Sequence, residues 1–396
     1  MDRPDVLVVG AGLTGCATGW HLARQGASVL IVDQGDVSAG ASGQNAGSLH
    51  FQIERRFLEH GEALADQASR VVALNRLAIA EWRGLEEMLG AHLEVTLAGG
   101  LMVAETADEL ALLERKCRRE AHYEIATELI DGDRARAIAP YLSDRVLAAS
   151  WLADEGHANP RLVTPAFASA AQAFGAEIRV HTRVVAIDDI DGGFCVTLAT
   201  AGRVRTVTVR QVLVAAGAWT AAVGALANLH LPVLPAGLTM SATQRAHVFM
   251  PHLIQHVGRR LSMKQTESGN VLIGGGWASR LYQDGKGAFD LSRPPALRPE
   301  NLRENLRAAA DVVPALAELA LLRCWTGTVA LTPDQLPIVG EVPRKPGFYV
   351  CAGGSGFTLG PVFARALAAA LGGTANDEHL ALFSPARFEH LNSFMG

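Results

Sequence analysis

The stretch from Val6 to Gln34 reads VLVVGAGLTGCATGWHLARQGASVLIVDQ, and it decides the fold of this chain. Its first apolar run, residues 6–9, predicts a buried parallel strand, and the alanine-rich segment that follows predicts a helix through about Gln25. Gly26 ends that helix, and the run SVLIVD predicts a second strand. The order strand–helix–strand is a βαβ unit, which indicates an α/β nucleotide-binding domain.

Three glycines of this stretch, Gly10, Gly12 and Gly15, have the spacing G-x-G-x-x-G. The first permits a tight turn, the second lets the backbone approach a pyrophosphate, and the third lets the helix pack closely on the strand. Asp33 ends the second strand, where a carboxylate accepts hydrogen bonds from ribose hydroxyls. The pattern predicts a dinucleotide site, with a purely structural glycine turn as the alternative. Because Asp33 disfavours a 2′-phosphate, NADP is disfavoured, while FAD and NAD stay open.

Composition and charge exclude several classes of protein. The 396 residues are 49% hydrophobic, enough for two domains or one large composite fold, and the formal net charge of −5 offers nothing to attract nucleic acid. No apolar run reaches the ~18 residues of a membrane span, and no secretory leader pattern is found. The cysteines lie far apart and form no CxxC pair, which argues against a disulfide framework or a metal site: Cys16, Cys117, Cys195, Cys324 and Cys351. We therefore expect a cytoplasmic protein without a bound metal.

Nucleotide-domain patterns at both ends of the chain enclose a β-rich middle at 232–290. A hairpin signal stands there, at Glu267-Ser268-Gly269-Asn270. Helical spacing predicts helices over residues 54–90 and 107–122, in PENLRENLRAAADVVPAL and in GPVFARALAAALGG. These patterns predict one Rossmann-type domain built from separate segments, with a second domain inserted between them.

Downstream segments resemble a known family. They are GASGQNAGSLH at 40–50, EGHANPRLVTPAFASAAQAFGAEIRVHTRV at 155–184, VLVAAGAWT at 212–220, and the last block, WTGTVALTPDQLPIVGEVPRKPGFYVCAGGSGFTLGPVFARALAAAL, at 325–371. Together they resemble the D-amino-acid oxidase/glycine oxidase family of FAD-dependent amine oxidoreductases. Within the family, these segments are most similar in sequence to opine oxidase β subunits, D-hydroxyproline dehydrogenases and hydrogen cyanide synthases. Residues 55–145 and 225–260 lie outside the resemblance.

The resemblance implies a glutathione-reductase-like FAD domain over 1–80, 150–218 and 325–396, and an α+β substrate domain with an antiparallel sheet over 81–149 and 219–324. Relatives that bind flavin covalently use a cysteine whose position is Gly327 here, or a histidine that would fall near Gln44, so we expect noncovalent FAD. By motif position the residues that hold FAD are Gly10, Gly12, Gly15, Asp33, Ser42, Asn45, Ala46, Gly47, Ser48, Val184, Ala216, Gly217, Trp219, Gly353, Gly354, Phe357, Thr358 and Leu359.

The substrate end departs from the family pattern. Where glycine and D-amino-acid oxidases carry a carboxylate-binding arginine, this chain has Val329, and the final loop CAGGSGFTLGP has no arginine. Either another cation binds the substrate carboxylate in place of this arginine, or the substrate is not a simple free amino acid. Lys264 is a candidate cation or promoter of oxygen reactivity, unless it is a solvent-facing strand lysine, and Arg280 is its rival. His50 follows the loop near the flavin and is a candidate for contact with the substrate. Trp277 and Trp325 are candidates for the pocket wall, although core tryptophans would look the same in sequence.

We therefore expect an enzyme that oxidises the C–N bond of a glycine, D-amino-acid, sarcosine- or opine-like substrate. A hydride would pass to flavin N5, and the imine formed would then hydrolyse. The missing arginines favour N-substituted substrates. The alternative is a flavoprotein subunit that relays electrons within a heteromeric dehydrogenase, and homo-oligomers also stay open. An NAD-dependent dehydrogenase is a third possibility, which a flavin spectrum would exclude.

Overall fold

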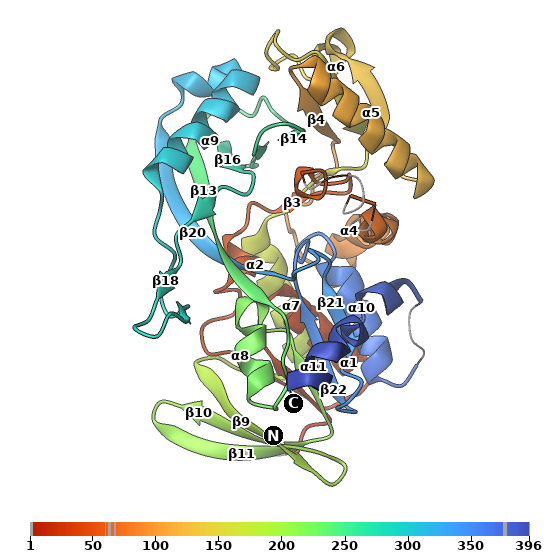
Figure 1. Ribbon diagram of the computed structural model, residues 1–396, viewed down its shortest axis with the longest axis vertical. Coiled ribbons are helices and arrows are strands. Elements are labelled where there is room, and N and C mark those ends of the chain that lie inside the picture. The colour runs from red at the N-terminus through yellow and green to blue at the C-terminus, as the bar shows by residue number, and fades with distance from the viewer. Residues whose placement is uncertain (1–2, 60, 62–64, 67–68, 375–377, 396) are drawn as a thin grey trace.

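The computed structural model describes residues 3–59, 61, 65–66, 69–374 and 378–395. The molecule is elongated (Figure 1). A three-stranded antiparallel sheet of β9 (Thr182–Ile190), β10 (Gly193–Thr200) and β11 (Arg203–Val209) lies at one end. Helices α5 (Ala107–His122) and α6 (Gly132–Ile138) lie at the other end. The helix predicted over 107–122 is thus confirmed.

A six-stranded sheet forms the nucleotide-binding half. Its order is β21-β22-β12-β1-β2-β8, and only β21 runs antiparallel to its neighbour. The strands are β1 (Val6–Val9), β2 (Val29–Val32), β8 (Glu177–Arg179), β12 (Gln211–Val214), β21 (Ile338–Glu341) and β22 (Phe348–Ala352). Every residue of β1 and β2 is buried, as expected for parallel strands covered on both faces. The predicted βαβ unit and the Rossmann-type sheet are confirmed.

Helices cover this sheet. α1 (Leu13–Arg24) packs against α7 (Pro160–Ala173) and α10 (Gly360–Leu371), so segments from the two ends and the middle of the chain form one layer. The β9–β11 sheet, which was not predicted, is inserted between β8 and β12. Alternate residues of β10, such as Phe194, Val196 and Leu198, are buried in the same core cluster as strands of the Rossmann sheet. This period of two is typical of strands that cover a core with one face.

The second half contains a nine-stranded, mostly antiparallel sheet. Its main path is β17-β13-β16-β15-β14-β4-β6-β5, and β20 also pairs with β13. The strands are β4 (Gly100–Ala104), β5 (Glu128–Asp131), β6 (Ala148–Leu152), β13 (Leu234–Arg245), β14 (Leu253–His256), β15 (Ser262–Gln265), β16 (Asn270–Gly274), β17 (Ala278–Ser279) and β20 (Leu321–Leu331). The predicted hairpin is confirmed, because β15 and β16 pair antiparallel across a turn in which Gly269 has φ +89°.

The helix predicted over residues 54–90 is only partly correct. The structure has short 3-10 helices η1 (Arg55–Phe57) and η2 (Arg70–Leu74) before α4 (Asn75–Leu89), while residues 60, 62–64 and 67–68 lie outside the described part. The amides just before η1 are used elsewhere: those of Phe51 and Gln52 donate to the carboxylate of Glu155, and that of Ile53 donates to Glu120. These bonds hold the segment before η1 against the buried carboxylates, and a regular helix begins only at Asn75.

The two sheets are joined by the β13–β20 ribbon, the antiparallel pair whose register runs from Leu234 opposite Leu331 to Thr243 opposite Leu321. In Figure 1 this ribbon extends between the two halves of the molecule. The domain boundaries stay a prediction, and β20 continues across the one placed at residue 325. The described part of the second half also includes α9 (Pro299–Val312), and no described helix has the length and apolar content needed to cross a bilayer.

Candidate active site

The glycine loop after β1 forms a cradle that side chains would fill. Gly10 has φ +116°, and a Cβ there would lie 2.4 Å from the carbonyl oxygen of Ala215. A Cβ at Gly15 would lie 2.0 Å from the carbonyl oxygen of Gly10, so this glycine packs α1 onto the strand. Helix α1 begins directly after Gly12, so the backbone amides of its first turn point toward the loop and favour an anion there.

Asp33 fixes the shape of this loop. Its carboxylate accepts hydrogen bonds from the amide of Ala11 at 2.7 Å and the amide of Gly35 at 2.8 Å. A carboxylate has about four lone-pair sites, so these two bonds leave it able to accept hydrogen bonds from a ribose as well. Ser42 also contacts the loop, where its Oγ accepts from the amide of Leu13 at 3.0 Å.

A cavity of about 1720 Å³ extends from this cradle to the nine-stranded sheet. We call the region lined by Gly10, Asp33 and Val184 its nucleotide part, and the region lined by Leu238, Met240, Gln255, Leu261 and Ser262 its sheet part. Pockets for ordinary small ligands measure about 300–1,000 Å³, so this cavity has room for FAD and a substrate together. All the predicted FAD residues line it except Gly15, Gly47 and Leu359. The residues present therefore fit FAD.

The loop after β22, residues 353–359, closes the cavity on another side. Gly353 has φ +120°, and a Cβ at Gly354 would lie 2.5 Å from Nη1 of Arg56. The hydroxyl of Thr358 accepts from the amide of His50 at 3.2 Å, and its carbonyl accepts from the indole of Trp82 at 2.8 Å. The loop that the resemblance assigns to the flavin is thus held against the segment that follows the short strand β3 (Ser48–Leu49).

Among the predicted catalytic residues, His50 lines the cavity, and its Nε2 lies 2.9 Å from Oγ of Ser262. Lys264 is 2% exposed, donates to the carbonyl of Ala158 at 2.8 Å, and does not line the cavity. The alternative of a solvent-facing lysine is therefore wrong. Burial lowers the pKa of Lys264 to about 7.

The other three predicted residues also lie outside the lining. Arg280 is exposed, with its Cζ 5.9 Å from the ring centroid of Tyr282. The indole of Trp277 donates to the carbonyl of Arg260 at 2.6 Å, and that of Trp325 donates to the carbonyl of Gln44 at 2.8 Å. Both tryptophans hold backbone whose residues line the cavity, and their roles in the reaction stay predictions.

Sequence reasoning missed a charged wall of the cavity, formed by Glu54, Arg55, Arg56, Glu59 and Arg260. Nε and Nη2 of Arg56 donate to Glu54 at 3.2 and 3.1 Å, and Nη2 also donates to Ser355 at 2.8 Å. Arg55 forms an ion pair with Glu59, and Nη2 of Arg260 lies 3.9 Å from the same carboxylate. Residues 55–145 lie outside the family resemblance, so the only signal was the sequence ERR following the predicted flavin loop.

His50 and Glu54 adjust each other's protonation at this wall. Burial lowers the pKa of His50, but the hydrogen bond and charge of Glu54 outweigh it and leave the pKa raised. Burial raises the pKa of Glu54, but the charge of Arg56 and the bond to His50 hold it well below its usual range. Glu54 is therefore charged at neutral pH.

A buried polar network supports the segment that carries His50. The ammonium of Lys116 contacts Glu120 at 2.8 Å, Gln52 at 2.8 Å and Ser150 at 3.0 Å, and Lys116 and Glu120 are both 0% exposed. Glu155, whose pKa is raised by burial, accepts from the side chain of Gln255, which lines the cavity. Because every partner is buried, the network fixes residues 50–53 relative to the sheet.

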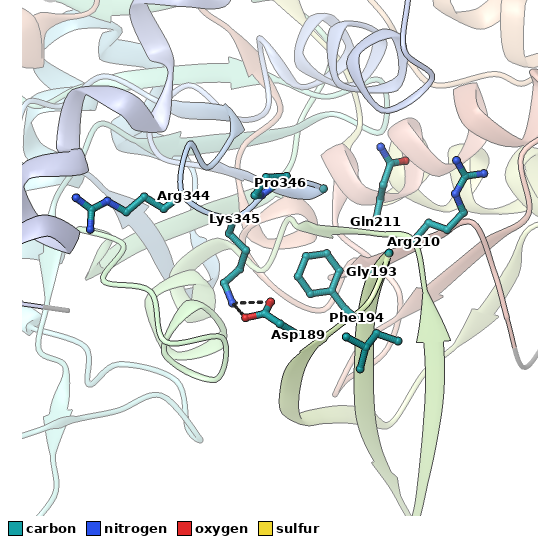
Figure 2. A pocket seen from close by; sticks show the side chains of 11 residues that line it. Asp189, Gly193, Phe194, Arg210, Gln211, Arg344, Lys345 and Pro346 are labelled. Carbon is teal, nitrogen blue, oxygen red and sulfur yellow. Dashed lines mark hydrogen bonds and ion pairs between the residues drawn. The ribbon is translucent and has the colours of Figure 1, made fainter.

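A second, shallower pocket of about 520 Å³ lies between the β9–β10 turn and residues 344–347. Figure 2 shows Lys345 and Asp189 pointing toward each other there, with Nζ–O distances of 2.9 and 2.8 Å. None of the predicted FAD residues lines this pocket. The five cysteines are free thiols, and the described residues hold no group of three His, Cys, Asp or Glu side chains suited to a metal.

Comparison with known proteins agrees with this geometry. A subunit of opine oxidase from Rhizobium meliloti is 25% identical over 397 residues, which cover 98% of this chain and 99% of that protein. Glycine oxidase of Geobacillus kaustophilus is 29% identical over 364 residues, covering 91% and 90%. Its crystal structure matches with a TM-score of 0.82 over 97% of this chain and 98% of that one. Iminodiacetate oxidase of Chelativorans sp. BNC1 matches with a TM-score of 0.77 and 25% identity, covering 96% and 98%.

The match to a protein-family model shows to which family the chain belongs. The model of the DAO family, described as FAD dependent oxidoreductase, matches residues 5–370, nearly the whole chain. The match includes the glycine cradle, Asp33 and the loop after β22, which together line the nucleotide part of the cavity and its closing side. The chain therefore belongs to the DAO family of FAD-dependent oxidoreductases.

Proposed function

We propose that this enzyme uses FAD to oxidise the C–N bond of an N-substituted, carboxylate-bearing amine. The observation that supports this most is one shared cavity, because the FAD cradle and the charged wall line the same space. A substrate held at the wall would share that space with the cofactor. FAD, when bound, supplies the acceptor for a hydride from the carbon next to the amine nitrogen.

In such a reaction the protein has to exclude water and orient the substrate, and the side chains of the sheet part are suited to both. Leu238, Met240, Leu261 and Val329 line it with apolar surface, which excludes water and restricts the orientation of a bound amine. His50 lines the same cavity with its Nε2 2.9 Å from Oγ of Ser262, so it would help to orient a bound amine. The imine product needs only water to yield an oxo acid and an amine.

The preference for an N-substituted substrate has two supports. Val329 lines the cavity at the position where the family resemblance places a carboxylate-binding arginine, so binding of a free amino acid through that position is lost. In addition, the names of two relatives, opine oxidase and iminodiacetate oxidase, refer to secondary amines that carry more than one carboxylate.

Anaerobic bleaching of the flavin tests the proposal. The FAD-loaded chain is mixed without oxygen with iminodiacetate, an opine, sarcosine, glycine and D-alanine, and the loss of the oxidised flavin spectrum is followed. We expect the secondary amines with two carboxylates to bleach the flavin fastest. If no amine bleaches a chain that holds FAD, the proposal is wrong.

A second candidate function is that of a flavoprotein subunit within a heteromeric dehydrogenase. It is favoured by the match over nearly the whole length of a relative that is named as one subunit of an oxidase. In that case substrate would bleach the flavin of the isolated chain, but the reduced flavin would not be reoxidised by oxygen. Added partner subunits or an artificial electron acceptor would restore turnover.

A further inference from the structure

Arg55 and Arg260 meet at the charged wall although they come from distant parts of the chain. Arg55 begins η1, and Arg260 lies in the turn between β14 and β15. Both approach Glu59: Arg55 as an ion pair, and Arg260 with Nη2 at 3.9 Å. We propose that Arg55 and Arg260 are the carboxylate-binding pair of this enzyme, in place of the arginine missing at position 329. This inference rests on the proposed function and names the residues that would bind its substrate.

The first argument is the balance of charge. Two guanidinium groups share one carboxylate, so this part of the wall keeps one net positive charge. Burial, and next the charge of Arg260, lower the pKa of Arg55, which indicates that the two cations are close enough to repel each other. A bound carboxylate would relieve that repulsion with a charge-assisted bidentate contact.

The second argument is the bonding capacity that is left over. Nε of Arg55 is buried and has no hydrogen-bond partner among the described residues. Within the described part of the chain, the side chain of Arg260 makes only a long contact to Glu59 and a 3.3 Å bond to the carbonyl of Gly276. Arg56 also has a buried nitrogen, Nη1, without a partner among the described residues, but its Nε and Nη2 donate to Glu54 and Ser355, so it already holds the loop after β22 in place.

The third argument is access. The side chain of Arg260 is 44% exposed, and the turn beside it, Gly274–Gly276, lines the cavity without side chains. The acids of the nearby hairpin β18 (Tyr282–Gln283) and β19 (Phe289–Asp290) do not compete for it. Asp290 bonds to Arg293 at 3.0 Å, and Asp284 accepts from amides of its own turn. Arg260 therefore lines the cavity with a guanidinium group that a ligand can reach.

Binding of plain carboxylates tests the pair without relying on turnover. The FAD-bound chain is titrated with succinate and with acetate, and the perturbation of the flavin spectrum gives each Kd. We expect Arg260→Gln to weaken succinate binding by at least about tenfold, while Arg260→Lys restores part of the loss. Arg307→Gln is the matched control, because Arg307 lies on α9, is 67% exposed and pairs with Glu304 at 2.7 Å.

Reduction by iminodiacetate supplies the second measurement. In Arg260→Gln the apparent Kd should rise by about tenfold while the limiting rate of flavin reduction changes little, as expected when binding common to ground and transition states is lost. The same should hold for Arg55→Gln if it retains FAD. The proposal that Arg55 and Arg260 bind the carboxylate would be wrong if Arg260→Gln left the affinities for succinate and iminodiacetate unchanged, or if the wild-type chain bound no carboxylate. Absence of bleaching by any amine would instead refute the proposed function.

Discussion

The nucleotide part and the sheet part of the cavity are built on different principles. In the nucleotide part the backbone itself sets the residue types, because Gly10 has a positive φ and both Gly10 and Gly15 leave no room for a Cβ. In the sheet part and at the charged wall, side chains from separate segments come together through packing, as Arg55 and Arg260 do at Glu59. The residue types of the nucleotide part are therefore set by local backbone geometry, whereas the substrate side of the cavity is formed by contacts between segments that are distant in the sequence.

The largest expected effect tests whether the sheet part depends on its buried network. Lys116→Met leaves Glu120 buried without its cation, and we expect a loss of about 3–5 kcal/mol in the free energy of unfolding, measured by urea denaturation. The double variant Lys116→Met/Glu120→Leu should recover much of this loss, because no unpaired charge is left. A single variant as stable as wild type would show that the network carries little of the fold.

The next effect tests the backbone control of the nucleotide part. In Gly10→Ala the new methyl group meets the carbonyl of Ala215, and we expect FAD affinity to fall at least about a hundredfold, which is roughly 2.7 kcal/mol. Gly26→Ala is the control, because Gly26 also has a positive φ, +86°, but has no neighbour within 4 Å of a Cβ. It should lose about 1 kcal/mol of stability and keep its FAD. If both variants lost FAD affinity equally, the positive φ of each glycine would determine the loss, and the close contact between a Cβ at Gly10 and Ala215 would not.

A smaller effect concerns Lys264, whose buried amine has a pKa of about 7. Since this value lies below the ordinary lysine pKa, the folded chain loses the proton first, and the unfolded chain holds more protons above pH 7. Wild-type stability relative to Lys264→Met should therefore increase from pH 7 to pH 9, by roughly 2 kcal/mol. Denaturation curves of both proteins at the two pH values measure this. A difference that stays constant with pH would mean that Lys264 keeps its proton.

The smallest effect lies outside both parts of the cavity. Lys345 and Asp189 form an ion pair at the shallow pocket of Figure 2, where Asp189 is 66% exposed. Lys345→Gln should cost less than about 1 kcal/mol, the usual range for surface pairs. Its FAD and carboxylate affinities should equal those of wild type. A changed FAD affinity would show that the β9–β11 sheet affects the cofactor.

The two parts also differ in how far the sequence predicts them. The βαβ unit, the hairpin at Gly269 and most FAD residues follow from local patterns, because turns and glycine positions impose residue types over a few neighbours. The charged wall does not follow, because Arg55 and Arg260 are about two hundred positions apart and meet only through the sheet. The helix predicted over 54–90 begins only at Asn75, with the short 3-10 helices η1 and η2 before it, and nothing in the local sequence pattern distinguishes these segments.

The β13–β20 ribbon has a mechanical consequence. Gly327 and Val329 line the cavity, and the same strand begins at Leu321 in the far part of the nine-stranded sheet. Its antiparallel pairing is continuous except for one register shift near Thr243, so a change in the angle between the two halves would have to bend both paired strands together. Substrate entry should therefore depend on local movement of loops and side chains, and the angle between the halves should be the same with and without a bound amine.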